Sequence, residues 1–347
     1  MRKVSIDSLV GGEIVAKEIC IENGIILIPP GAVIKKDYIE KMKELRINGV
    51  YIESDNETRC SKEIIEDKIQ EECKNLVKTT IEKYSYCADE HLQKIVTVAD
   101  QIMNDILTDP EVVYNISCVR EKDESTYSHS VNVTALSVLI ALKLKLAKNR
   151  VRDLAIGALL HDIGIVYLPS NCRNVILAQC DEEKKAVIKK HVITGYSMVE
   201  TQDWISNLSK DIILSHHERD DGSGYPMRLT KEKIRIETKI VALCDEFDSR
   251  VYGNFVERQK VNSVIDYILC EAGRKFDFKV VQTFIESVVV YPIGTHVRTN
   301  LNEIGIVIQQ NYKMPTRPVI QIIDQETKEV VIIDLVKELT MYIVEAL

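Results

Sequence analysis

Residues 154–164 read LAIGALLHDIG and place an adjacent histidine and aspartate at the end of an apolar helical segment. Leu154 and Ala158 stand seven and three positions before His161. Residues three, four or seven positions apart share one face of a helix, so the sequence predicts that His161 points into a core. Burying an imidazole beside a carboxylate without binding partners costs folding free energy, so further groups should accompany this pair.

Further ligand-type residues occur on helical segments around this pair. Each one precedes or follows apolar residues at helical spacing, or is paired with a neighbour that does, so the same argument predicts that they all face the core. The full set is His129, His161, Asp162, His191, His216, His217 and Asp245. Bundle cores commonly hold metals, and imidazole and carboxylate ligands without thiolate suit Mn, Fe, Co, Ni or Zn. Because seven side chains exceed one coordination sphere, we expect two divalent ions.

Five motifs in this region resemble the HD-GYP family, a branch of the HD phosphohydrolases. They read HSVNV at 129–133, HDIG at 161–164, HVITG at 191–195, HHERDDGSGYP at 216–226 and DEFD at 245–248. The eleven-residue run is highly specific, whereas an isolated His-Asp pair is a weak signal. The resemblance covers about residues 120–288. It implies a helical domain that hydrolyses cyclic di-GMP at a site with two or three metals.

When the family's metal ligands are carried over position by position, the resemblance implies that they divide between two ions. Fe or Mn is the favoured metal, and Zn, Co or Ni stays an alternative. One ion takes His129, His161, Asp162 and Asp245, and the other takes Asp162, His191, His216 and His217. His161 and Asp162 are then the catalytic pair, and a hydroxide that bridges the ions attacks the phosphodiester.

Two further positions bear on the number of metals. Family members with a third metal have a glutamate four residues before the first histidine. Here Ser125 stands at that position, with Glu124 beside it, which favours two metals. Asp248 lies one turn after Asp245, and we expect it to support the helix or a ligand instead of binding metal.

The substrate-binding residues are expected in and around the loop that names the family. That loop either braces the two adjacent histidines or forms a substrate wall in which the tyrosine faces a guanine, because glycine and proline restrict the backbone to defined shapes. The expected set is Gly224, Tyr225, Pro226, Arg219 and Arg250.

The sequence departs from the family where positive charge is usual. The family pattern H-D-x-x-K has Ile165 at its last position, and a basic R-x-Y-R/K motif after Asp245 falls on Asn254 and Glu257, with Arg250 in a displaced copy. Each lost charge-assisted contact weakens binding by about 1.5–3 kcal/mol.

Three functions therefore stay open. The first is a phosphodiesterase that converts cyclic di-GMP to linear pGpG, GMP or both. The second is a catalytically weak or inactive receptor or interaction module that binds cyclic di-GMP or a partner protein. The third is an HD hydrolase of another phosphorylated nucleotide.

The predicted fold class is mainly α, with an HD-type helical bundle core, a small mixed α/β module at the amino end and a small β-rich module at the carboxyl end. Turn residues such as Pro29-Pro30-Gly31 separate short apolar bursts near the start, and β-rich pieces follow Tyr291-Pro292. The predicted domains are 1–57 (mixed α/β module), 58–110 (helical connector), 111–288 (metal-dependent domain) and 289–347 (β-rich module).

Composition restricts the partners and the compartment. The net charge of -8 argues against binding to a nucleic acid polymer or an anionic membrane. The nine scattered cysteines favour reduced thiols, and no signal peptide or membrane-spanning run fits the sequence. We therefore expect a bacterial signalling protein that is cytoplasmic and not inserted in a membrane. Cyclic di-GMP is the expected ligand, and a signalling partner protein and a homodimer are left open.

Overall fold

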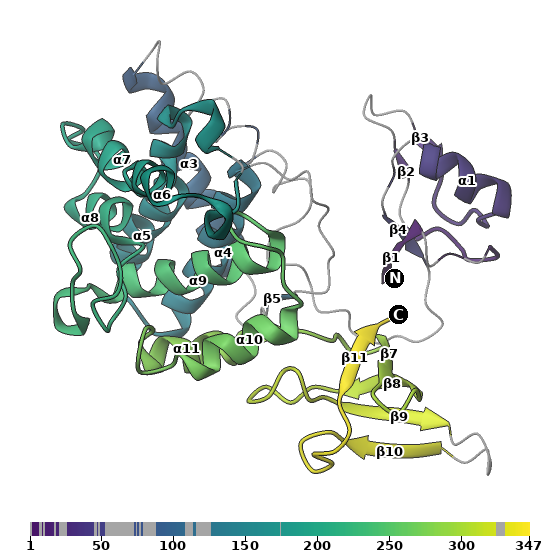
Figure 1. Cartoon of the computed structure of the whole chain (residues 1–347). Helices are drawn as coiled ribbons and strands as arrows, with labels where there is room; N and C mark the ends of the chain where they lie inside the picture. The colour runs from purple at the N-terminus through teal and green to yellow at the C-terminus, as the bar shows by residue number, and fades with distance from the viewer. Residues whose placement is uncertain are drawn as a thin grey trace. The chain divides into compact units, whose positions relative to one another are not determined.

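The structure is a computed structural model (Figure 1). It describes residues 2–6, 9, 11–16, 19–20, 26–44, 47, 49–52, 73, 75, 78, 88–107, 114–115, 126–173, 175–323 and 330–347. The chain divides into two compact units. One comprises Lys62–Val290 and Tyr312–Pro315, and the other comprises Met1–Ser61, Tyr291–Asn311 and Thr316–Leu347.

The larger unit is a bundle of helices. Its α-helices are α3 (Ala88–Leu107), α4 (Thr126–Lys143), α5 (Lys148–Leu160), α6 (Glu182–Lys189), α7 (His191–Val199), α8 (Asn207–Ser215), α9 (Ile236–Tyr252), α10 (Val261–Cys270) and α11 (Phe278–Ile285). Short 3₁₀ helices lie between them: η2 (Ile163–Tyr167), η3 (Ser170–Cys172), η4 (Leu177–Gln179) and η5 (Lys231–Lys233). The strands β5 (Tyr114–Asn115) and β6 (Val288–Val289) pair in parallel.

Helix α4 lies at the centre of this bundle. Every residue from 128 to 141 is buried, as expected of a helix that is covered on all sides. It packs against α3, α5 and α9, while α5 also packs against α8. Helix α3, which lies within the predicted connector, is therefore one of the helices that pack on the bundle.

Close backbone contacts bring the helices together around the His-Asp pair. A Cβ atom on Gly164 would overlap the carbonyl oxygen of His191 and crowd the backbone nitrogen of Gly195. Only glycine therefore lets η2 lie against α7 at this distance. The sequence uses Gly164 to hold the end of α5 next to the start of α7.

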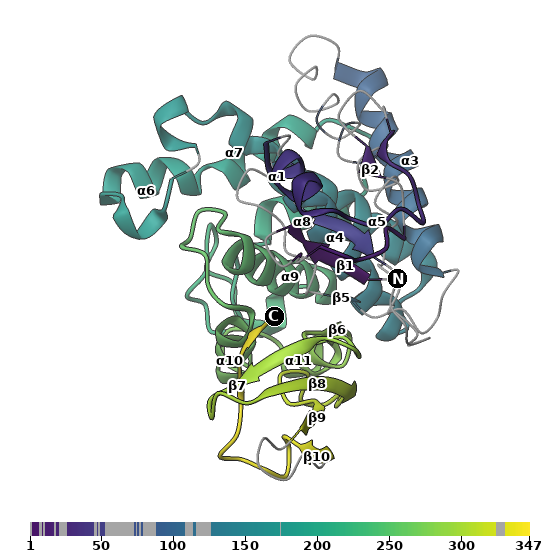
Figure 2. The ribbon, with the colours of Figure 1, turned by 90° about the vertical axis from the view of Figure 1, so that its right-hand side faces the viewer.

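The carboxyl-terminal module is a five-stranded antiparallel sheet, shown in yellow-green in Figure 2. Its strands are β7 (His296–Thr299), β8 (Ile304–Gln309), β9 (Val319–Ile323), β10 (Val330–Asp334) and β11 (Ile343–Ala346), in the order β10-β9-β8-β7-β11. Val297, Val307 and Ile320 are fully buried on one face of the sheet. The β-rich pieces predicted after Tyr291-Pro292 form β7 to β10, whereas β11 was not predicted.

The amino-terminal module contains short strands and one helix. Its elements are β1 (Arg2–Ser5), β2 (Ile19–Cys20), β3 (Ile26–Ile28), α1 (Lys36–Glu44) and β4 (Gly49–Ile52), with β1 antiparallel to β4 and β2 antiparallel to β3. Ile39, Met42 and Leu45 recur at the three-residue spacing of a helix face, which predicts a helix here. Ile39 and Met42 are buried on α1, and Leu45 lies outside the described residues.

The predicted fold class is confirmed: the chain has a mainly helical core, a mixed α/β module before it and a β-rich module after it. The boundaries of the four predicted domains stay a prediction. Among the helices described, none has the length and apolar character needed to cross a bilayer.

Candidate metal centre

Five parts of the helical bundle deliver the predicted ligands to one place. His129 lies on α4, His161 and Asp162 follow α5, His191 begins α7, His216 and His217 follow α8, and Asp245 lies on α9. Six of these seven residues are buried, and only the side chain of His217 is substantially exposed, at 21%. The structure therefore brings together the whole set that helical spacing placed on buried faces.

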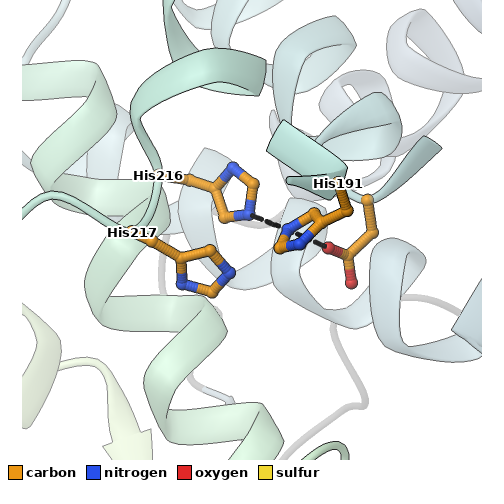
Figure 3. A group of neighbouring side chains, drawn as sticks. His191, His216 and His217 are labelled. Atoms are coloured by element: carbon orange, nitrogen blue, oxygen red, sulfur yellow. Dashed lines mark hydrogen bonds and ion pairs between the residues drawn. The ribbon is translucent and has the colours of Figure 1, made fainter. Parts of the chain in front are cut away.

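Asp162 is common to two groups of potential ligands. In each group, one ligand atom from every residue lies within 4.8 Å of the others. The groups are Asp162, His191, His216 and His217, and His129, His161 and Asp162. Figure 3 shows the rings of His191, His216 and His217 pointing toward one another.

The two oxygens of Asp162 face different groups. Oδ1 lies 3.4 Å from Nε2 of His191 and 3.7 Å from Nε2 of His216. Oδ2 lies 3.4 Å from Nε2 of His161 and 3.8 Å from Nε2 of His129. A carboxylate in this position is suited to bridge two cations.

Asp245 lies beside the group formed by His129, His161 and Asp162. Its Oδ1 is 3.2 Å from Nε2 of His129 and 4.0 Å from Nε2 of His161, and its Oδ2 is 3.6 Å from Nδ1 of His217. It can therefore complete a set of four ligands with His129, His161 and Asp162, as the resemblance implies.

Hydrogen bonds on the outer side of the rings present Nε2 to the centre. The Nδ1 atoms of His161, His191 and His216 lie 2.7 Å, 2.8 Å and 3.1 Å from the carbonyl oxygens of Ala158, Ile188 and Ile213. A carbonyl only accepts, so each Nδ1 carries the proton and each Nε2 keeps a lone pair for a metal.

The donor set fits divalent ions on a second ground. Nε2 of His161 is fully buried and forms no hydrogen bond with any described group. A buried, unpaired lone pair is costly, and a cation at this position would satisfy it.

His129 differs from the other histidines because its Nδ1 lies 2.6 Å from a carboxylate oxygen of Asp248. Asp248 therefore contacts the outer nitrogen of a ligand-type residue, and its role in metal binding stays a prediction.

The electrostatics of the centre favour ionised carboxylates. Burial raises the pKa of Asp162, but the surrounding imidazoles, with His161 first, outweigh burial and hold the pKa below its ordinary value. Burial and the ring of His217 lower the pKa of His216, and burial lowers the pKa of His217 to about 3. The centre therefore combines an ionised Asp162 with neutral imidazoles at His216 and His217, which is the ionisation state that metal binding requires of these ligands. At His129 and His161 the neighbouring carboxylates outweigh burial and raise the pKa of the ring.

The loop that names the family packs on the adjacent histidines. The ring of Tyr225 stacks on His217, with 4.7 Å between centroids and 26° between planes. Buried Glu218 accepts hydrogen bonds from the backbone nitrogens of Met227 at 2.7 Å and Leu229 at 2.8 Å. A Cβ on Gly224 would overlap the backbone of residues 217–219. These contacts favour the bracing role of the loop. Because Tyr225 is only half-buried, part of its ring is also available to form a substrate wall.

The two arginines predicted to bind substrate share one carboxylate. Nη2 of Arg219 lies 2.7 Å from Oε2 of Glu246, and Nη2 of Arg250 lies 2.7 Å from Oε1. The Arg250 guanidinium also lies 4.0 Å from the ring centroid of Tyr267. Their positive charge is therefore partly neutralised by Glu246, which the sequence did not predict.

The other predicted positions are placed as follows. Ile165 is buried in an apolar cluster with Leu168, Cys172 and Ile188. Asn254 and Glu257 follow the end of α9. Pro226 joins Tyr225 through a cis peptide bond. Ser125 and Glu124 lie outside the described residues.

One cation near the centre was missed at the sequence level. Nζ of Lys189 lies 5.3 Å from the centroid of the Tyr225 ring. Its place two residues before the ligand-type residue His191 was the one available signal. A contact with a loop 36 positions away cannot be read from that spacing.

Comparison with known proteins agrees with this geometry. Residues 111–280 match the family model described as HD domain, and residues 296–347 match the model described as KOW domain associated with HD domain. "Cyclic di-GMP phosphodiesterase PA4108" of Pseudomonas aeruginosa is 30% identical over 225 residues, which are 65% of this chain and 54% of that protein. "Cyclic di-GMP phosphodiesterase PdeB" of Borreliella burgdorferi is 30% identical over 204 residues, covering 58% of this chain and 52% of that protein.

A solved structure, "Bd1817, a HDG"Y"P protein from Bdellovibrio bacteriovorus", matches 82% of this chain and 97% of its own, with 21% identity and a TM-score of 0.48. The chain spans about half the length of the curated relatives it matches. The matched HD domain contains all seven clustered ligand-type residues and the Gly-Tyr-Pro loop. Residues 111–280 are therefore an HD domain, and the motifs and the curated relatives support the HD-GYP branch of that family.

Proposed function

We propose that this chain is a metal-dependent phosphodiesterase that hydrolyses cyclic di-GMP to linear pGpG, GMP or both. The observation that carries the proposal is the position of Asp162, whose two oxygens face separate groups of histidine Nε2 atoms. A centre that needed one structural ion would not require seven convergent ligands. The relatives from Pseudomonas aeruginosa and Borreliella burgdorferi, both named as cyclic di-GMP phosphodiesterases, support the choice of substrate.

The proposed ligands follow from the two groups. His129, His161, Asp162 and Asp245 would hold one ion, and Asp162, His191, His216 and His217 would hold the other. Fe and Mn are favoured, and Zn, Co and Ni also match this donor set. When bound, such a pair supplies an activated water and neutralises phosphodiester oxygens.

The protein's own residues would orient and enclose the reaction. The hydrogen bonds of the Nδ1 atoms fix the ring planes and direct Nε2 of each ring toward the proposed ions. The Tyr225 ring, packed on His217, would form one wall for a guanine base. Glu218 would keep that wall in place because it binds two backbone nitrogens of the loop.

A second function, binding without turnover, is favoured by one specific observation. Ile165 lies in an apolar cluster, and Arg219 and Arg250 are both paired with Glu246, so few charges are left for a doubly anionic ligand. In that case the chain would act as a receptor or interaction module.

The experiment is incubation of the full chain, loaded with Mn²⁺ or anaerobically with Fe²⁺, with cyclic di-GMP, followed by chromatography of the nucleotides. We expect pGpG or GMP from the wild type and none from Asp162→Ala. Asp266→Ala, which changes an exposed aspartate on α10, is the matched control and should retain activity. Tight binding without product would support the receptor. Hydrolysis of a different phosphorylated nucleotide alone would support the third function.

A further inference from the structure

We propose that Lys189 is the cation that binds a phosphate of the cyclic dinucleotide, at a site where the usual lysine is replaced by Ile165. This inference rests on the proposed function and names a substrate-binding residue for it.

The first support is the position of the ammonium group. Lys189 is the last residue of α6, its side chain is exposed, and its Nζ lies 5.3 Å from the centroid of the Tyr225 ring. That ring stacks on His217, one of the clustered ligand-type residues. A ligand whose base stacks on an exposed part of this wall would carry its phosphates close to Lys189.

The second support is the rigid backbone on both sides of Lys189. The preceding Ile188 is buried, with 1% of its surface exposed. Nδ1 of His191 donates a hydrogen bond to the carbonyl oxygen of Ile188 at 2.8 Å. The stem of Lys189 is therefore held next to the metal centre, and only its flexible side chain has to adjust to a ligand.

The third support is the role that Ile165 has taken. Ile165 and Ile188 belong to the same buried apolar cluster, together with Leu168 and Cys172. The aliphatic side chain at 165 thus belongs to the apolar cluster that buries the residue preceding Lys189. We infer that position 165 supports the end of α6, while Lys189 supplies the charge.

The fourth support is the state of the competing cations. Arg219 and Arg250 both bind Glu246, whereas Lys189 forms no ion pair with any carboxylate in the described ranges. An unpaired ammonium loses little when it meets a phosphate, and a charge-assisted hydrogen bond to phosphate is stronger than a neutral one. Lys189 is therefore better placed to bind an incoming anion than either arginine.

The test compares Lys189→Gln with Lys190→Gln, which removes the same charge from the neighbouring exposed residue. In the described part of the chain, Lys190 contacts no aromatic ring. We expect Lys189→Gln to raise KM for cyclic di-GMP about tenfold and to leave kcat within about threefold, because one partly screened charge contact is lost. Lys190→Gln should match the wild type, and Lys189→Arg should restore most of the loss.

Equilibrium binding gives a readout that does not depend on turnover. The probe is a phosphorothioate analogue of cyclic di-GMP, titrated calorimetrically into the metal-loaded protein at low and high salt. We expect Lys189→Gln to weaken binding and to reduce its salt dependence, because exposed charges are screened by ions. Equal metal content in all variants would show that the centre itself is unchanged.

The outcomes separate this inference from the proposed function. If the wild type hydrolyses cyclic di-GMP and Lys189→Gln has the same KM and Kd, the role of Lys189 is wrong and the function stands. The same conclusion follows if Lys190→Gln is as impaired as Lys189→Gln. If the metal-loaded wild type neither binds nor hydrolyses the dinucleotide, both are wrong.

Discussion

Nδ1 of His129 lies 2.6 Å from Oδ2 of Asp248, inside the helical bundle. The other ring nitrogen, Nε2, lies 3.2 Å from Oδ1 of Asp245, one turn earlier on the same helix. Burial lowers the pKa of His129, but the two carboxylates outweigh burial and raise it well above its ordinary value. Helix α9 therefore holds the imidazole that α4 contributes, because Asp245 and Asp248 contact its two ring nitrogens.

Replacing Asp248 with asparagine removes the charge that supports His129. We expect Asp248→Asn to lower the affinity for the ion bound by His129 about 10- to 100-fold, the usual effect of losing a carboxylate behind a ligating histidine. Competition with a chelating dye measures this affinity. Asp266→Asn, at an exposed position on α10, is the control and should bind as the wild type does. Unchanged affinity in Asp248→Asn would mean that the carboxylate has no part in metal binding.

Gly164 sets the distance between the His-Asp pair and α7. A methyl group there would overlap the carbonyl oxygen of His191, so Gly164→Ala must push η2 away from α7. We expect this variant to lose bound metal and to unfold at a lower temperature. Ser170→Ala, at an exposed position in η3, is a control that should change neither property. A Gly164→Ala protein with full metal content would show that the two segments tolerate separation.

Restoring the family lysine at position 165 should harm this protein. Ile165 is 5% exposed and packs in an apolar cluster, so Ile165→Lys would place an ammonium group among aliphatic side chains. We expect a loss of about 2–4 kcal/mol in the free energy of unfolding, measured with urea, and no gain in hydrolysis. Ile165→Val should lose about 1 kcal/mol. A stable Ile165→Lys variant with faster turnover would show that this position faces the substrate.

Glu246 gives the fold a dependence on pH. Burial raises the pKa of Glu246, but Arg219 and Arg250 outweigh burial and hold it below its ordinary value of 4.5. The stabilisation is therefore complete above pH 4.5 and is lost as the pH falls below it. We expect the unfolding free energy of the metal-free wild type to decrease more steeply between about pH 5 and pH 3 than that of metal-free Glu246→Gln. Identical slopes in urea titrations would contradict this role.

Local spacing predicted the parts of the site that depend on one helix. Leu154, Ala158 and His161 share a face because a helix repeats every 3.6 residues, and the same reasoning applies to the other ligands. The seven residues do converge in the structure. Their assignment to two ions stays a prediction.

Contacts between distant segments could not be predicted in this way. The direction of Ile165 depends on a 3₁₀ turn after α5, and the contact between Lys189 and Tyr225 joins two separate segments. The pairing of both arginines with Glu246 is likewise a tertiary contact. Strand β11 was missed because a short terminal apolar segment becomes a strand only by pairing with β7.

The most direct test of the central claim is the number of divalent ions bound per chain. Wild-type protein is loaded with Mn²⁺, desalted and measured by mass spectrometry of the metal, beside Asp162→Ala and the control Asp266→Ala. We predict two ions in the wild type and in the control. Asp162→Ala should lose both ions, because the two oxygens of Asp162 face both groups of histidines. A wild type that retains no metal, or an Asp162→Ala protein that retains two ions, would contradict a centre built around Asp162.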